Sequence, residues 1–260
     1  MLPRRFATGF HRRLLADDGT VVAAVHQPRW PARDDGDKSL AVVVVHGFMA
    51  HARHPRTLRI AGWLRHHAGV VLLDLRGHGA SRGVSTLGWQ EVRDVEAAVE
   101  WARSLGYARV ATLGFSLGAA VVLRHAALYG GVDAVAAVSG PGRWYYRGTT
   151  GMRLIHWLVL APPGRALVRM GRRTRITRRR WAEPLPLDPA AAASEVTAPM
   201  LIVHGGRDSL IPVDHAWEID AAAGGRATLW VLPSFGHAEA GVDATLAGRI
   251  GEWLEEACLA

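Results

Sequence analysis

A serine stands between two glycines in the stretch Gly114-Phe115-Ser116-Leu117-Gly118, after an apolar β-branched run and before a helix-like run. A tight turn from strand to helix requires small residues two positions either side of the serine, because larger side chains would clash. Such a turn exposes the serine hydroxyl as a nucleophile and points the N–H groups of the helix start at whatever it attacks. The alternative interpretation is a glycine-rich loop without chemistry.

A serine hydroxyl is a poor nucleophile near neutral pH and requires a histidine base that a carboxylate orients. Among the 13 histidines, His237 follows the last apolar strand-like run, in a loop that can reach Ser116. Asp208 directly follows another such run, although Asp214 and Glu239 lie near enough in the sequence to be alternatives. We therefore predict a nucleophile, a base and an acid at Ser116, His237 and Asp208.

The elements that must position these residues alternate between strands and helices. Continuous apolar runs predict strands buried on both faces of a parallel sheet within residues 40–48, 69–79, 108–115, 132–142, 199–208 and 226–237. Helical periodicity falls within residues 54–68, 86–106, 118–130, 213–224 and 244–260, and an Asp-Gly turn predicts a hairpin over residues 12–29. This alternation predicts an α/β fold with a mostly parallel sheet covered by helices on both faces, and the motifs follow the strand ends.

Five motifs in order along the chain, VVVVHGF, DLRGHGAS, GFSLG, HGGRDSLIP and FGHAE, resemble those of the α/β-hydrolase superfamily, in particular its cap-bearing serine esterases and lysophospholipases. The resemblance covers nearly the whole chain, and the order Ser116, Asp208, His237 is the order that this fold uses. It implies the α/β-hydrolase fold and an oxyanion hole built from the backbone N–H groups of Phe48 and Leu117.

Residues 142–198 interrupt the alternation and are expected to form a helical cap over the active site, broken at Pro162-Pro163. The core would then consist of residues 1–141 and 199–260. Apolar residues in or near the cap are expected to line an acyl pocket, with simple packing on the core as an equal alternative. They are Met49, Trp144, Tyr145, Leu154, Ile155, Trp157, Leu158, Val159 and Leu160.

The formal net charge of +8 is concentrated in the cap. Residues 142–182 contain eleven arginines and no acidic residue, so the rest of the chain is mildly acidic, and residues 172–180 alone contain six arginines. A solvated face is the default interpretation, and a site for an anionic lipid surface or a phosphate-bearing substrate is the next. Nucleic-acid binding is not expected, because the cap offers no groove-reading element.

The remaining histidines are interpreted as structural. His46, His204 and His78 follow predicted strands, where their side chains are expected to order loops. The close histidine pairs at 51, 54 and 66, 67 have no clustered carboxylate or cysteine partners, so no metal ion is expected. No cofactor is implied either, because the chain has no dinucleotide or phosphate-loop fingerprint.

We therefore predict a serine hydrolase that cleaves a carboxylic ester with an apolar acyl group through an acyl-enzyme. Thioester, amide and carbon–carbon bond hydrolysis and peroxidation stay open on the same residues, as does a non-catalytic protein that binds a ligand or a partner. A single cysteine, no apolar signal-peptide core and no apolar run of about 18 residues lead us to expect a cytoplasmic protein, not an integral membrane protein.

Overall fold

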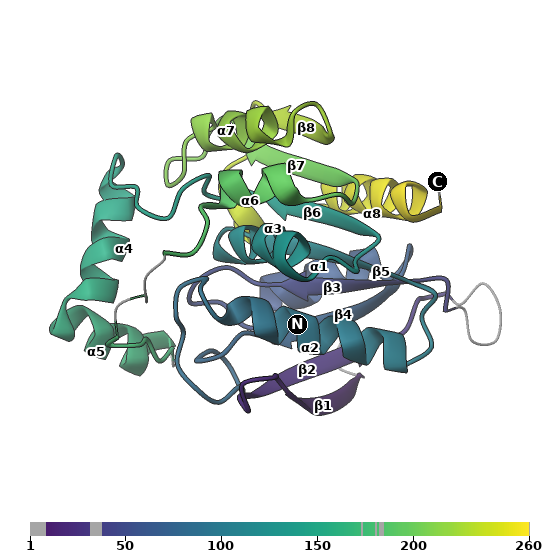
Figure 1. Ribbon diagram of the computed structural model, residues 1–260, viewed down its shortest axis with the longest axis horizontal. Helices are drawn as coiled ribbons and strands as arrows, with labels where there is room; N and C mark the ends of the chain where they lie inside the picture. Colours follow the sequence, from purple (N-terminus) through teal and green to yellow (C-terminus); the bar gives the residue numbers. More distant parts are fainter. Residues whose placement is uncertain (1–8, 32–37, 173, 180, 182–184, 260) are drawn as a thin grey trace.

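The computed structural model describes residues 9–31, 38–172, 174–179, 181 and 185–259, and it centres on an eight-stranded sheet (Figure 1). The strands are β1 Phe10–Leu15, β2 Val21–Gln27, β3 Leu40–Val45, β4 Gly69–Asp74, β5 Arg109–Phe115, β6 Ala134–Val138, β7 Met200–Gly205 and β8 Ala227–Leu232. Their order across the sheet is β1-β2-β4-β3-β5-β6-β7-β8. Strands β3 to β8 run parallel to one another, and β2 is antiparallel to both of its neighbours, β1 and β4. This confirms the predicted mostly parallel sheet.

Helices cover both faces of this sheet (Figure 1). They are α1 Pro55–Leu64, α2 Glu91–Ser104, α3 Leu117–Tyr129, α6 Pro189–Glu195, α7 Asp214–Ala223 and α8 Ala244–Leu259. One apolar cluster lies between the sheet and α2, α3, α6 and α7, and a second lies between the sheet and α1 and α8. Alternate residues of β3 enter opposite clusters, Val43 the first and Val44 the second. The strand is therefore apolar throughout, because both of its faces are covered.

The described part of the predicted cap contains α4 Thr150–Leu160 and α5 Pro162–Arg172, which pack against each other to one side of the sheet (Figure 1). The break between them falls at the predicted proline pair. Helix α6 lies within the predicted cap segment of residues 142–198, but it packs against α3 and α7 and buries Ala192 and Ala193. Helix α6 is therefore a part of the core.

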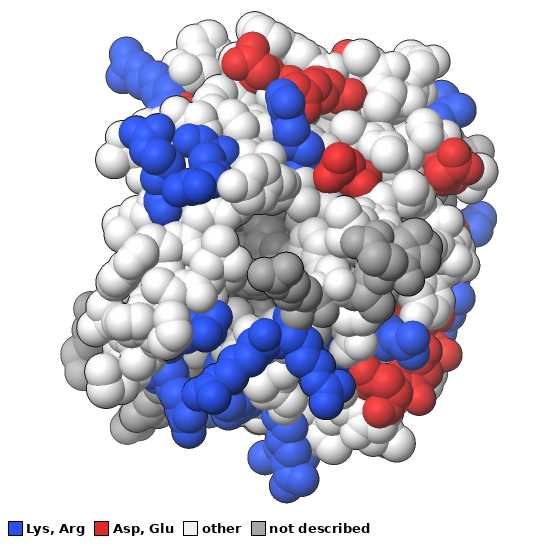
Figure 2. Space-filling view, turned by 60° about the vertical axis from the view of Figure 1, so that its left-hand side comes forward, with Lys and Arg blue, Asp and Glu red and all other residues white. Residues whose placement is uncertain are grey.

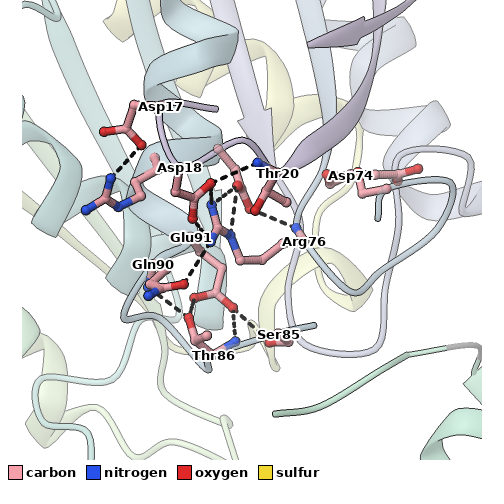
Figure 3. Close-up of polar contacts among 12 residues, drawn as sticks. Asp17, Asp18, Thr20, Asp74, Arg76, Ser85, Thr86, Gln90 and Glu91 are labelled. Atoms are coloured by element: carbon pink, nitrogen blue, oxygen red, sulfur yellow. Dashed lines mark hydrogen bonds and ion pairs between the residues drawn. The ribbon is translucent and has the colours of Figure 1, made fainter. Parts of the chain in front are cut away.

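A buried arginine holds the loop that follows β4 (Figure 3). Arg76 donates to Asp94 from Nε at 2.9 Å and from Nη2 at 2.7 Å, and its backbone N–H donates to the other Asp94 oxygen at 2.8 Å. Arg76 Nη1 also donates to Asp18 in the β1–β2 turn at 2.6 Å. One guanidinium group thus ties together the hairpin, the loop after β4 and helix α2.

Glu91 organises the next part of this loop (Figure 3). Its fully buried carboxylate accepts hydrogen bonds from the hydroxyls of Ser85 and Thr86 and from the backbone N–H groups of Thr86, Leu87 and Gly88. Leu87 and Gly88 have φ of 60° and 103°, outside helical geometry. Helix α2 therefore begins at Glu91 rather than at residue 86, where the periodicity had placed it.

The chain that leaves the cap pairs with the same loop. We call residues 174–179 the return segment. The N–H of Ser85 donates to the Arg175 carbonyl at 2.7 Å, and the N–H of Thr177 donates to the Ser85 carbonyl at 2.9 Å. The N–H of Arg175 donates to Gly77 at 2.8 Å. The return segment is thus attached to the core by backbone hydrogen bonds, although Arg173 and Arg180 of the arginine run lie outside the described residues.

Candidate active site

Ser116 occupies a sharp turn between β5 and α3, with φ of 51° and ψ of −113°. A Cβ at Gly114 would lie 2.2 Å from the Gly118 carbonyl oxygen, and a Cβ at Gly118 would lie 2.3 Å from the Val45 carbonyl oxygen. Both distances are far below any van der Waals contact, so only glycine fits at these two positions. The turn presents the Ser116 hydroxyl at the carboxyl edge of the sheet, where ligands bind in open α/β folds.

His237 lies between Ser116 and Asp208. Its Nε2 is 3.0 Å from Ser116 Oγ, and its Nδ1 is 2.7 Å from Asp208 Oδ2. Because a carboxylate can only accept, Nδ1 carries the proton and Nε2 is left to accept the hydrogen bond of the serine hydroxyl. The structure therefore brings together all three side chains that the sequence singled out, from loops after β5, β7 and β8.

The Asp208 carboxylate is buried and surrounded by hydrogen-bond donors. Burial alone would raise its pKa, but the hydrogen bond from His237 and those from the N–H groups of Ile211 and Leu210 outweigh burial. The pKa of Asp208 is consequently held below its ordinary value, and the group is ionised near neutral pH. The two sequence alternatives make no such contact: Asp214 begins α7, and Glu239 bonds elsewhere.

Close backbone contacts bring the Asp208 and His237 loops together. A Cβ at Gly205 would lie 2.3 Å from the Phe235 carbonyl oxygen, so glycine allows the end of β7 to approach the loop after β8. The N–H of Arg207 also donates to Phe235, at 3.1 Å. His204 Nε2 donates to the Ile211 carbonyl at 2.8 Å, which orders the turn that follows Asp208.

Two polar residues support the His237 loop in ways that the sequence reasoning missed. The Ala238 N–H donates to Ser139 Oγ at 3.0 Å, and Glu239 Oε1 accepts from the Gly47 N–H at 2.8 Å. Ser139 follows β6, and Glu239 is one of the two alternative acids that the sequence offers. The available signals were a serine directly after a strand and a carboxylate two residues after the base.

Phe48 and Leu117, the two expected oxyanion donors, line the same cavity as Ser116. Leu117 is the first residue of α3, where N–H groups have no carbonyl partner within the helix. A Cβ at Gly47 would lie 3.3 Å from the Ser116 Cβ, so glycine lets the loop after β3 pass close beside the serine. The backbone segments that carry the two N–H groups therefore both lie next to Ser116.

Buried histidines order the loop that carries Phe48. His46 Nδ1 donates to the Gly47 carbonyl at 2.8 Å, and its Nε2 accepts from the Leu75 N–H at 3.2 Å. The His78 ring packs against His46 and Phe48, with ring centroids 5.0 and 6.0 Å apart. Burial lowers the pKa of His46 and lowers that of His78 to about 3, so both rings are neutral and act as loop supports.

A cavity of about 790 Å³ lies between Ser116 and the cap, and most of its lining side chains are apolar. Trp144 and Tyr145 are in its wall. Helix α4 contributes one face, with the spacing of neighbouring helical turns, namely Met152, Ile155, His156, Val159 and Leu160.

Four of the expected pocket residues do not line this cavity. Leu154, Trp157 and Leu158 lie on other faces of α4, and Leu154 and Trp157 are 55% and 46% exposed. Met49 has φ of 62°, a left-handed conformation that turns the chain just after Phe48, and its side chain is not in the wall. The contribution of α4 to the cavity wall is thus limited to the face described above.

Among the described residues, no three histidine, cysteine or carboxylate side chains are grouped so that they would hold a metal ion. Within the same part of the chain, every helix is too short or too polar to cross a bilayer.

Comparison with known proteins places the chain in a family. The family model described as "Alpha/beta hydrolase family" matches residues 42–247. A monoacylglycerol lipase of Mycolicibacterium smegmatis is 30% identical over 215 residues, which cover 69% of this chain and 74% of the lipase.

Solved structures share the fold. The Pyrococcus furiosus esterase Pf2001 superposes with a TM-score of 0.75 at 20% identity, over 98% of this chain and 96% of the esterase. The esterase RhEst1 from Rhodococcus sp. ECU1013 gives a TM-score of 0.68 at 18% identity, over 94% and 98% of the two chains. The family model spans most of the sequence, and the solved structures share the overall fold. The chain therefore belongs to the alpha/beta hydrolase family.

Proposed function

We propose that this protein is a serine hydrolase that cleaves carboxylic esters with an apolar acyl group. The observation that carries the proposal is the position of His237, 3.0 Å from the Ser116 hydroxyl and 2.7 Å from Asp208, beside a largely apolar cavity. Membership of the alpha/beta hydrolase family and the likeness to a monoacylglycerol lipase and to esterases support it.

Acylation begins when Ser116 Oγ attacks the ester carbonyl carbon and His237 Nε2 takes the hydroxyl proton. The carbonyl oxygen becomes an oxyanion that accepts hydrogen bonds from the N–H groups of Phe48 and Leu117. Asp208 holds the Nδ1 proton of His237 and stabilises the imidazolium. The low pKa of Asp208 keeps it ionised throughout.

The tetrahedral intermediate then collapses, and the ester C–O bond breaks as His237 gives its proton to the leaving alcohol oxygen. Water enters, loses a proton to His237 and attacks the acyl-enzyme carbonyl. The second intermediate releases the carboxylic acid and returns the proton to Ser116. The apolar face of α4 holds the acyl chain during both steps.

The test is reaction of the purified protein with a fluorophosphonate probe and with aryl esters of increasing acyl length. We expect labelling at Ser116 and hydrolysis that falls at least about 10³-fold in Ser116→Ala. A folded protein that takes up no label and cleaves no ester would contradict the proposal and favour a binding protein.

A further inference from the structure

A second cavity, of about 920 Å³, lies between helix α5 and the loop before α2. The return segment forms its third side. Among the described residues, five arginines line it and no aspartate or glutamate does: Arg165, Arg169, Arg175, Arg178 and Arg179. We call this cavity the arginine groove.

Two of these arginines hold the walls of the groove. Arg165 Nη1 donates to the Leu160 carbonyl at 2.8 Å, across the break between the two cap helices. Arg175 Nε donates to the Gly83 carbonyl at 2.9 Å, and its Nη2 donates to Ser81. Arg165 therefore joins α5 to the end of α4, and Arg175 joins the return segment to the loop that follows β4.

The other three arginines are available to a ligand. Among the described residues, the guanidinium groups of Arg169, Arg178 and Arg179 form neither an ion pair nor a hydrogen bond. Three neighbouring cations without a carboxylate repel one another, and an anion with several oxygens would relieve that repulsion. A phosphate matches the planar donor fork of arginine.

The frame that carries these arginines is built before any ligand binds. The return segment is hydrogen-bonded to Ser85 and Gly77, and the loop that contains Ser85 is held by the buried Glu91 carboxylate. Backbone placed in this way lowers the ordering cost of binding. The groove is therefore a formed site and differs from a solvated arginine tail.

The arginine groove adjoins the active-site cavity. Arg165, Thr177, Arg178 and Arg179 line both. Figure 2 shows a hollow on the face that the cap forms, with a band of Lys and Arg side chains below it. One molecule can thus place an ester at Ser116 and an anionic group in the groove.

We propose that the arginine groove binds the phosphate group of a single-chain acyl ester while its carbonyl carbon lies at Ser116. The substrate class is a phosphate-bearing lysolipid, in which the acyl chain occupies the apolar cavity and the phosphate lies on the alcohol side of the ester. This inference rests on the proposed function for its catalytic part, and on the groove alone for phosphate binding.

The first experiment compares two substrates with the same acyl chain and ester bond, 1-decanoylglycerol 3-phosphate and 1-decanoylglycerol, both below micelle formation. The measured quantity is the ratio of their kcat/KM values. We expect this ratio to fall about tenfold in Arg169→Gln, because Arg169 lines the groove but not the active-site cavity. The matched control Arg59→Gln removes an equal charge from an exposed position on α1 and should leave the ratio unchanged. An equal ratio in all three proteins overturns the proposal.

A binding experiment separates the groove from the chemistry. Dodecyl phosphate is titrated by calorimetry into the Ser116→Ala protein and into the Ser116→Ala/Arg169→Gln protein, with inorganic phosphate as competitor. Weaker binding of dodecyl phosphate to the double variant supports phosphate binding in the arginine groove. This result does not depend on catalysis, so it would hold even if neither ester is cleaved and the proposed function fails.

Two results, one from the calorimetry and one from an added vesicle sedimentation assay, would assign these arginines to a different ligand. Inorganic phosphate that binds as tightly as dodecyl phosphate would mean that the groove takes a free anion without the acyl chain. Sedimentation with phosphatidylglycerol vesicles that is lost in Arg169→Gln, with an unchanged kcat/KM ratio, would mean that the arginines meet a membrane surface. Either result overturns the substrate proposal.

Discussion

Two carboxylates, those of Asp208 and Glu239, lie at the loop that contains His237 and form hydrogen bonds with different partners. Asp208 bonds the His237 ring, whereas Glu239 bonds the Gly47 N–H, one peptide before the proposed oxyanion donor Phe48. Glu239 therefore links the loop of His237 to the loop of Phe48. Its position two residues after His237 lets one short segment align both parts of the site.

Asp208→Asn tests the first carboxylate. An amide keeps the size of the side chain but offers no charge to a protonated His237, so we expect kcat to fall by about 10³-fold to 10⁴-fold with KM little changed. Steady-state kinetics on one aryl ester measures this. A loss smaller than tenfold would show that another group orients His237.

Glu239→Ala tests the second carboxylate. It leaves the Gly47 N–H unpaired beside Phe48, so we expect kcat to fall by about tenfold to a hundredfold, while KM stays within about twofold. Glu239→Gln retains an acceptor oxygen and should recover most of the activity. If the Gln and Ala variants are equally impaired, the hydrogen bond to Gly47 is not the cause.

At the scale of elements, most strands and helices were predictable from pattern, but their finer placement was not. Strand β3 is apolar on both faces, so its burial follows from composition alone. Helix α4 is apolar almost all round, and no periodicity could select which face meets the cavity. Helix α6 is a short alanine-rich run, so it carried no amphipathic signal that would assign it to the core.

The same limit applies to the site. Ser116, Asp208 and His237 could be predicted because each follows a strand whose end must reach one edge of the sheet. Ser139 and Glu239 bond loops that are about 100 or more positions distant in the sequence. Contacts of that kind depend on loop conformation, for which a single sequence gives no pattern.

Glycine substitutions test how the turn at Ser116 is packed. Gly118→Ala would drive a Cβ to 2.3 Å from the Val45 carbonyl oxygen, so we expect a loss of about 1–3 kcal/mol in the free energy of unfolding. Gly248→Ala in α8 is the matched control. Its Cβ would meet nothing within 4 Å, and the change should stabilise the protein by about 0.5–1 kcal/mol. Urea unfolding measures both, and equal effects would contradict the packing argument.

At the scale of the whole molecule, stability should depend on pH through the hairpin. Burial would raise the pKa of Asp18, but hydrogen bonds from Arg76 and from Thr20 lower it to about 2. A lowered pKa means that the stabilisation by Asp18 is complete above the unfolded value near 3.8 and is lost as the pH falls toward about 2. The ion pair between Arg76 and Asp18 of the hairpin is therefore lost at acidic pH.

The measurement is the free energy of unfolding of wild type and Asp18→Asn between pH 7 and pH 2. We expect wild type to be the more stable protein at pH 7, and the difference to shrink as the pH falls below about 4. Asp17→Asn, which removes a more exposed ion pair with Arg93, should show a difference below about 1 kcal/mol throughout. A constant Asp18→Asn difference across this range would refute the assignment.

The attachment of the return segment has a consequence for how such a protein diversifies. Ser116, Asp208 and His237 all lie outside the cap, and the cap is joined to the core at Ser85 and Gly77 largely through main-chain atoms, which any amino-acid sequence supplies. Residues of the cap can therefore be exchanged while its attachment and the hydrogen bonds among these three side chains are preserved. If the proposed function holds, the residues that select the substrate and those that cleave the bond can change independently. A foreign cap grafted between residue 142 and the return segment is then expected to leave the arrangement of Ser116, His237 and Asp208 intact.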